Sequence, residues 1–212
     1  MPCPICQKRK AKRFCPAKGE AICSVCCGTE REVTIDCPSD CPYLVSSRQY
    51  DQERAEIDWT KVPFSETKVP SSFVASHESL LLALTYRICV YARENPQLAD
   101  PGVRAALEAL AETYRTLSSG IYYERPPDYV LERGLYDALK AILEDYKKAP
   151  AQQLGLAGAR DSEIRDALVF LAQLAAVRSN GRPKGRATID FLRRQFKSEE
   201  FSKPASPIVT LP

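Results

Sequence analysis

Residues 100–120 read DPGVRAALEALAETYRTLSSG, and this stretch carries the clearest structural signal in the chain. Asp100 is a favoured residue just before a helix and Pro101 a favoured first helical residue, so a helix is predicted to begin here. Apolar side chains then recur three or four residues apart and fall on one face. They are Val103, Leu107, Leu110, Tyr114 and Leu117. Gly120 is a natural stop, because glycine suits the left-handed backbone at a helix end.

Similar apolar stripes lie on both sides of this segment. Helices are predicted over about 77–94, after the double proline at 126–127, and over about 161–179. A shorter C-terminal helix carries Ile189, Leu192 and Phe196. Each long segment has to bury its stripe against the others. The sequence therefore predicts an all-α bundle of four long helices plus a short C-terminal helix.

The helix predicted after residues 126–127 has two further features. Its expected inward residues are Leu131, Leu135, Ala138, Ile142 and Tyr146. Gly134 lies inside it and should destabilise it by about 1 kcal/mol relative to alanine. Tyr122, Tyr123 and Tyr129 flank the prolines. These tyrosines either pack at one end of the bundle or form a peptide-binding surface.

Composition excludes several protein classes. The chain has 212 residues, 44% hydrophobic and 27% charged, which is typical of a globular protein with one ordinary and one small domain. No run of about 18 apolar residues is present, so no membrane span is predicted. The first residues, MPCPICQK, contain no apolar core of a signal peptide. We therefore expect a cytoplasmic location.

Cysteines are concentrated at the N-terminus, where eight of the nine lie between positions 3 and 41. They are Cys3, Cys6, Cys15, Cys23, Cys26, Cys27, Cys37 and Cys41. Thiolates suit zinc, and four of them satisfy its tetrahedral preference, so this spacing predicts two structural zinc ions per chain. Residues 1–45 hold few large apolar side chains, and so small a core usually needs a metal. Disulfides would need an oxidising compartment, and one iron–sulfur cluster would leave four cysteines unexplained.

The distribution of the ligands between the two sites has two solutions. Cys26 and Cys27 are adjacent, and adjacent side chains point in different directions, so they should bind different ions. In the first solution one ion is held by Cys3, Cys6, Cys23 and Cys26, and the other by Cys15, Cys27, Cys37 and Cys41. In the second solution Cys26 and Cys27 change places. Either solution interlocks the two sites as a cross-brace.

Residues 13–16 (RFCP) and 22–27 (ICSVCC) resemble segments of HIT-type and MYND-type zinc fingers. The resemblance covers residues 1–45. It implies two zinc ions in a cross-brace and contacts with other proteins. It also favours the second solution, in which Cys27 is the partner of Cys23.

Two basic segments, residues 8–13 and 178–197, are candidates for nucleic-acid binding in a chain of net charge +3. The possible contacts in the second segment are Arg182, Lys184, Arg186, Arg193 and Arg194. The alternative for the first segment is that its cations offset thiolate charge and support the sulfur atoms. The alternative for the second is a loop between two helices, where basic residues follow a helix C-terminus.

The chain is predicted to have four parts. They are a two-zinc module (1–45), a short helix with a proline-containing linker (46–75), the bundle (76–200) and a tail (201–212). No P-loop, GxSxG motif or Glu-x-x-His pair is present, and His77 is the single histidine, so no enzyme is predicted. The predicted function is a zinc-stapled adaptor or regulator that contacts another protein, and a zinc-dependent nucleic-acid-binding regulator is the alternative.

Overall fold

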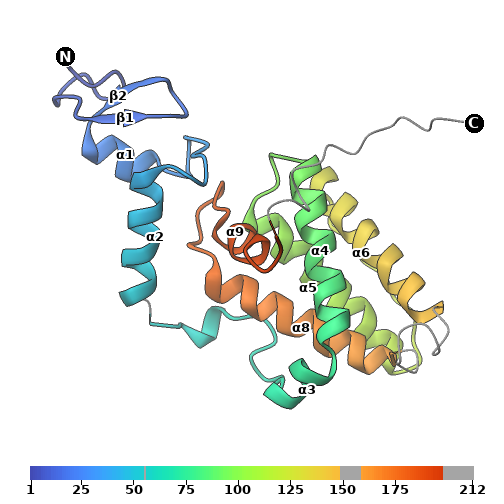
Figure 1. Cartoon of the computed structure of the whole chain (residues 1–212). Helices are drawn as coiled ribbons and strands as arrows, with labels where there is room; N and C mark the ends of the chain where they lie inside the picture. Colours follow the sequence, from blue (N-terminus) through green and yellow to red (C-terminus); the bar gives the residue numbers. More distant parts are fainter. Residues whose placement is uncertain (55, 149–158, 198–212) are drawn as a thin grey trace, which may run out of the picture.

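Helices make up most of the structure, a computed structural model that describes residues 1–54, 56–148 and 159–197 (Figure 1). The helical fold class predicted from the sequence is therefore confirmed. The predicted tail, 201–212, and the end of the predicted bundle, 198–200, lie outside the described residues. None of the helices in the described ranges is long and apolar enough to cross a membrane.

Each long helix predicted from the sequence is present, with ends close to those expected. The helices are α4 (Glu78–Glu94), α5 (Asp100–Ser118), α6 (Val130–Lys148), α8 (Asp161–Arg178) and the short α9 (Ala187–Arg193). Helix α5 packs against both α6 and α8, while α4 packs against α6 and α9. The buried apolar side chains of these helices form one core, called the helical core below.

The contact between α5 and α8 is the most extensive one in the helical core. The inward residues predicted for α5 are buried, except that Leu117 at its end is half-buried. Small side chains lie between the large ones and let the two backbones approach. They are Ala106 and Ala111 of α5 and Ala167 and Ala172 of α8. Each fully buried leucine of this interface contributes roughly 1.5–3 kcal/mol.

Helix α6 buries a different face from the one predicted. Its fully buried residues are Leu135, Tyr136, Leu139 and Leu143. Of the predicted inward residues only Leu135 is among them, and the others lie half-buried at the edge of the face. The reason is a polar anchor: the Tyr136 hydroxyl lies 3.0 Å from Thr113 Oγ1 on α5 and donates to Glu124 at 2.8 Å. A tyrosine whose hydroxyl has hydrogen-bond partners can be buried. The spacing of apolar residues along the helix does not reveal such partners.

Gly134 inside α6 has a packing reason. Tyr91 of α4 crosses α6 at this point, and its hydroxyl donates to the Leu131 carbonyl at 3.0 Å. A Cβ atom at position 134 would collide with that hydroxyl. The intrinsic cost of the glycine is therefore offset by the close approach of the two helices.

The N-terminus forms a small separate unit, here called the cysteine unit (residues 1–41), at one end of the molecule (Figure 1). Strand β1 (Arg13–Cys15) pairs antiparallel with β2 (Glu20–Ile22), and the helix α1 (Ser24–Glu30) follows. Besides cysteines, its core contains Ile22 and Ile35. So small an apolar core agrees with the expectation that metal ligands have to stabilise this part.

The described residues between the cysteine unit and the helical core form three short elements. They are α2 (Pro42–Arg54), the 3-10 turn η1 (Trp59–Lys61) and α3 (Ser71–Ser76). Helix α2 begins directly after the last cysteine of the unit, earlier than the helix predicted from residue 46, and Leu44 is its buried residue. Further along, Gln173 of α8 donates to the carbonyls of Phe64 and Thr67 at 2.9 and 3.0 Å. These bonds fix the linker on the surface of the helical core.

Candidate metal centre

Four of the predicted metal ligands lie together. Their sulfur atoms are all within 4.8 Å of one another and belong to Cys3, Cys6, Cys23 and Cys26. The Cys6 and Cys23 sulfurs are 3.9 Å apart. Two corners of a zinc tetrahedron with bonds of about 2.3 Å lie roughly 3.8 Å apart. In this group it is Cys26 and not Cys27 that accompanies Cys23, as in the first solution and unlike the arrangement that the zinc-finger resemblance favours.

Two short structures bring these sulfurs together. The first is the turn after Cys3, where the Gln7 N–H donates to the Cys3 carbonyl at 2.7 Å and Gln7 has a left-handed backbone, with φ of 53°. The second is the start of α1, where the Cys23 sulfur accepts from the Cys26 N–H at 3.4 Å and caps the helix. The Cys23 N–H donates to the Cys3 sulfur at 3.2 Å and so links the two structures.

The protein environment favours ionisation of these thiols to different degrees. The N–H groups of Lys8 and Arg9 point at the Cys6 sulfur and lower the pKa of that thiol to about 6. Burial raises the pKa of the Cys26 thiol to about 12. The buried Cys26 thiol thus resists ionisation, and a bound dication would favour its thiolate form. Four clustered thiols of this kind fit a soft, tetrahedral ion such as zinc.

The other four predicted ligands do not converge into a second such group within the described residues. They are Cys15, Cys27, Cys37 and Cys41. The Cys27 sulfur accepts from the Arg31 guanidinium at 3.8 Å. Burial raises the pKa of the Cys37 thiol, and the charges of Cys41 and Cys15 raise it further. Cys37 therefore lies within electrostatic reach of Cys41 and of Cys15.

The cysteine unit is joined to the helical core through Glu32. This residue is 1% exposed and has a left-handed backbone, with φ of 53°. Its carboxylate accepts from Arg48 of α2 and from Asn180 in the loop between α8 and α9, each at 2.6 Å. Its carbonyl accepts from the Lys184 N–H at 2.8 Å. A buried carboxylate needs such charged and hydrogen-bonding partners, so Glu32 holds three segments in place.

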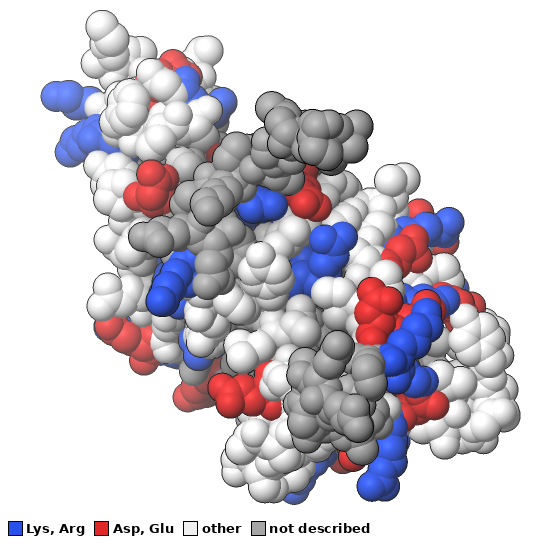
Figure 2. Space-filling model, turned by 45° about the vertical axis from the view of Figure 1, so that its right-hand side comes forward, with Lys and Arg blue, Asp and Glu red and all other residues white. Residues whose placement is uncertain are grey.

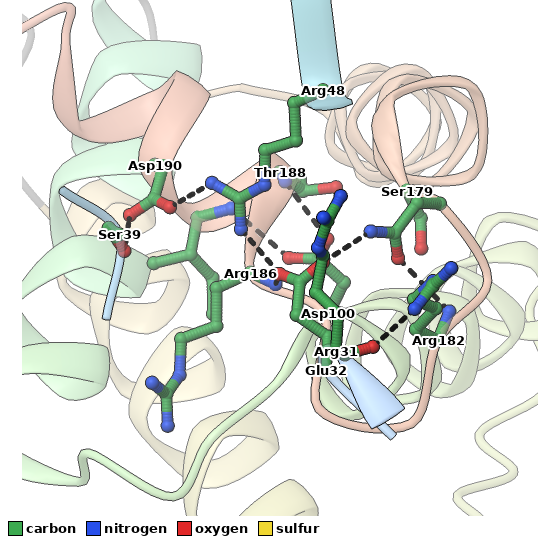
Figure 3. Close-up of polar contacts among 12 residues, drawn as sticks. Arg31, Glu32, Ser39, Arg48, Asp100, Ser179, Arg182, Arg186, Thr188 and Asp190 are labelled. Atoms are coloured by element: carbon green, nitrogen blue, oxygen red, sulfur yellow. Dashed lines mark hydrogen bonds and ion pairs between the residues drawn. The ribbon is translucent and has the colours of Figure 1, made fainter. Parts of the chain in front are cut away.

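Arg48 extends this network into α9 (Figure 3). Its guanidinium forms ion pairs with Glu32 and Asp190, both at 2.6 Å. The Ser39 hydroxyl donates to Asp190 at 2.9 Å. Burial disfavours the charged guanidinium, but the two carboxylates outweigh burial and raise the pKa of Arg48. We call Glu32, Arg48 and Asp190 the buried charge network.

Three of the predicted nucleic-acid contacts lie in the loop between α8 and α9, and the structure turns them toward the cysteine unit. Arg182 and Lys184 donate to backbone carbonyls of residues 28–34 at 3.0 and 2.9 Å. Arg186 forms an ion pair with Asp36 at 2.9 Å. These three cations therefore hold the cysteine unit against the helical core.

The other two predicted contacts, Arg193 and Arg194, lie at the exposed end of α9. Arg193 interacts with other groups of the chain. Arg194 lines a hollow of 330 Å³ between α2, α8 and α9, together with Arg48 and Arg178. No carboxylate is among the described residues that line this hollow. The structure thus divides the five predicted contacts into an inner set of three and an outer set of two.

The predicted basic segment 8–13 lies at the outer tip of the cysteine unit. Figure 2 shows Lys and Arg gathered at this tip, while acidic and basic side chains alternate over the visible face of the helical core. Most of the segment is exposed, and Arg13 stacks on the Tyr43 ring at 4.8 Å from its centre. The support of sulfur predicted for these residues comes from the backbone of Lys8 and Arg9.

Asp100 has a different role from the predicted one, which was to precede and cap its own helix. It is the first residue of α5 and not the residue before it, and it is 1% exposed. Its carboxylate accepts from the N–H groups of Thr188 and Ile189, at 3.0 and 3.2 Å. Burial raises the pKa of Asp100 to about 6, although these N–H groups oppose the increase. Asp100 therefore caps α9 and fixes it on α5.

Sequence reasoning singled out none of the three members of the buried charge network. Each is an ordinary charged residue in a polar stretch, and the pair of Arg48 with Asp190 spans 142 positions. No local pattern marks such a pair, because its partners meet only through the fold.

Comparisons of the chain with known protein families, curated proteins and solved structures find no match.

Proposed function

We propose that this chain is a zinc-stapled adaptor or regulatory protein that acts by contact with another protein, and not an enzyme. Zinc is favoured because four thiols surround one point, and a structural role because the protein supplies all four ligand positions. The proposal includes a second zinc on Cys15, Cys27, Cys37 and Cys41, supported by the spacing of the eight cysteines in the sequence. It also includes a cytoplasmic setting, where thiols stay reduced.

A protein partner is favoured by the exposed surface of the connector between α5 and α6. Five large side chains there are between 60 and 85% exposed. They are Ile121, Tyr122, Tyr123, Tyr129 and Val130. Aromatic and aliphatic side chains gathered on a surface are typical of protein-binding sites. Tyr122 is in part held at the end of the bundle, because its hydroxyl accepts from Lys140 at 3.1 Å, whereas Tyr129 is 75% exposed.

Capture from a lysate of the source organism at high salt tests this function. Wild type is compared with a double variant, Tyr129→Ser and Val130→Ser, and with the control Leu82→Ser, which replaces a side chain 43% exposed on α4. We expect nuclease-resistant capture of a protein by wild type and control, and loss of capture by the double variant. Capture that disappears with nuclease treatment would contradict a direct protein partner.

A nucleic-acid-binding regulator is the second candidate function, and one observation favours it. The hollow between α2, α8 and α9 is lined by Arg178 and Arg194 together with Gln49 and Gln52, while the lining Arg48 is held by its ion pairs with Glu32 and Asp190. Guanidinium and amide groups without a lining carboxylate are suited to a phosphate. The candidate therefore depends on Arg178 and Arg194 and not on the loop that holds the cysteine unit.

A further inference from the structure

A groove of 740 Å³ lies beside the exposed connector. It is bounded by α5, by residues 123–129 of the connector and by Pro63 and Phe64 of the linker. Its volume lies within the roughly 300–1,000 Å³ that is typical of ligand sites. The groove is separate from the candidate metal centre, since none of its lining residues belongs to the cysteine unit.

The floor of this groove is one face of α5. It runs from Ala105 through Ala109 to Thr116, and the two alanines present only short side chains there. At about 1.5 Å per helical residue this face is about 16 Å long. An extended peptide rises about 3.3 Å per residue, so about five residues would span it. This shape favours an extended chain segment over a compact small molecule.

The far wall of the groove is preformed. Glu124 of the connector accepts from Lys140 and Tyr136 of α6, both at 2.8 Å. The Lys140 ammonium, with the Tyr122 hydroxyl, lowers the pKa of Glu124 to about 2, so this anchor stays charged. The Thr116 hydroxyl donates to the carbonyl of Tyr123 at 3.3 Å. The connector is thus fixed at its backbone while its aromatic rings stay exposed, which lowers the entropy cost of binding.

The charges that line the groove are unequal. Its lining includes the carboxylates of Glu108, Glu112, Asp128 and Glu132 and the guanidinium groups of Arg115 and Arg125. Glu108 is paired with Arg104 of α5 at 3.0 Å. Arg115 is already paired with Glu112 at 2.7 Å. Burial raises the pKa of Glu132, and no neighbouring cation opposes it. The remaining lining cation, Arg125, can neutralise only one of the two carboxylates of Asp128 and Glu132. A cation brought by a ligand could therefore pair with these carboxylates.

We infer that this groove binds an extended, proline-containing basic segment of another protein, with its prolines and aliphatic stems on Tyr123 and Tyr129 and its lysine or arginine head groups at Asp128 and Glu132. Aromatic-lined grooves suit proline-rich extended chains, because such chains are already ordered. The inference names the partner chemistry of the proposed function and rests on it. Nucleic acid is disfavoured here, since phosphates would meet carboxylates.

Three labelled peptides test the inference by fluorescence anisotropy on the full-length, zinc-loaded chain. Each alternates proline with a second residue, which is lysine or arginine in one peptide, glutamate in another and serine in the third. We expect the basic peptide to bind at least about tenfold more tightly than the other two, and less tightly as salt rises. The double variant Asp128→Asn and Glu132→Gln should lose about tenfold in affinity for it.

A matched control removes the same charge elsewhere. Glu144→Gln with Asp145→Asn changes two exposed acidic residues of α6 that lie outside the lining of this groove. This control should bind the basic peptide like wild type, and circular dichroism should show that both variants fold. Equal loss of affinity in both variants, or equal binding of all three peptides, would overturn the inference.

The outcomes separate this inference from the function on which it rests. If the chain captures a protein from lysate after nuclease treatment but binds the three peptides equally, the proposed function stands. The inference that the groove binds a basic segment would then be overturned. Peptide discrimination without any captured protein would overturn the proposed function. A second copy of this chain could also present a basic segment, residues 8–13. A dimer in sedimentation experiments that the Asp128 and Glu132 double variant abolishes would overturn the assignment to a different protein.

Discussion

The cysteine unit and the helical core show two ways to stabilise a fold within one chain. In the unit, β1 has 3 residues and α1 has 7, and the core cluster is made of cysteines with two isoleucines. In the helical core, α5 has 19 residues, and aliphatic side chains from several helices are fully buried. The first part brings four possible metal ligands together, and the second removes a large apolar area from water.

The difference teaches where the two parts depend on each other. Neither contributes side chains to the core of the other, since the two buried clusters are separate. They are joined by polar contacts from the buried charge network and from the loop between α8 and α9. Hydrogen bonds and ion pairs weaken when their geometry changes. Unfolding of either part should therefore disrupt the polar contacts that join the two parts.

The largest expected effect is removal of the metal. Structural zinc contributes on the order of 10 kcal/mol or more to a small unit, so a strong chelator or Cys23→Ser should unfold the cysteine unit. The helical core should keep most of its circular dichroism signal, because its stripes need no cysteine. Elemental analysis of the intact chain should give two zinc ions per chain.

Two controls make this result decisive. Cys89→Ala changes a fully buried cysteine of α4 and should keep the full metal content. A fragment of residues 72–201 should be helical without metal. One ion per chain would contradict the second site, and loss of nearly all helical signal on chelation would show that the two parts depend on one stabilising core.

The next effect concerns the buried charge network. Glu32→Gln leaves Arg48 without one of its two carboxylates, and breaking a buried pair costs about 3–5 kcal/mol. We expect that loss in denaturant unfolding, with faster hydrogen exchange in the loop between α8 and α9. The control Glu20→Gln changes an exposed residue of β2 and should stay within about 0.5 kcal/mol. Equal effects of the two changes would show that Glu32 does not join the two parts.

The helices could be predicted because their signals are local. The start of α5 and the stripe of α8 depend on residues within a few turns, and both are where the pattern places them. Helix α6 shows the limit of that reasoning. Its buried face is centred on Tyr136, whose partners come from α5 and the connector, and a pattern of apolar residues contains no information about them.

The site could be predicted in part for the same reason. The spacing of the cysteines identified the ligand types, and the structure brings one group of four together. The choice between Cys26 and Cys27 required the direction of α1, which no spacing gives. The role of Arg182 and Arg186 required the position of the cysteine unit, and so a basic loop that holds the fold together looked like a surface for phosphates.

A smaller effect concerns Asp100, where the helical core depends on pH. Burial raises its pKa from 3.8 to about 6. The folded state therefore favours the protonated form, and this contribution is present below about pH 4 and lost as pH rises through 6. Roughly two pH units correspond to about 3 kcal/mol. Asp100→Asn removes this dependence, so wild type should lose up to about 3 kcal/mol relative to the variant between pH 4 and 7.

Denaturant unfolding of the two zinc-loaded proteins across this range measures the difference. The pH dependence of metal binding is common to both, so it cancels in the comparison. Parallel stability curves would contradict a raised pKa at Asp100.

The smallest effect separates the inner set of predicted nucleic-acid contacts from the outer set. Arg186→Gln loses the ion pair with Asp36 and should cost about 1 kcal/mol. Arg194→Gln changes an exposed residue and should stay within about 0.5 kcal/mol. Replacing all five predicted contacts together would mix these effects, so the outer residues have to be tested alone.

The nucleic-acid candidate is decided by Arg178 and Arg194, which line the hollow between α2, α8 and α9. If the hollow binds phosphate, Arg178→Gln with Arg194→Gln should reduce the salt slope of oligonucleotide affinity by about two, one per lost contact. We expect at most weak binding that is independent of sequence, because the hollow offers few cations and the helical core beside it carries many carboxylates. The measurement is affinity for duplex and single-stranded oligonucleotides at several salt concentrations. Tight binding that survives in the double variant but disappears in Arg186→Gln would contradict this candidate. It would show that the loop between α8 and α9 binds nucleic acid, and that this loop has to release the cysteine unit to do so.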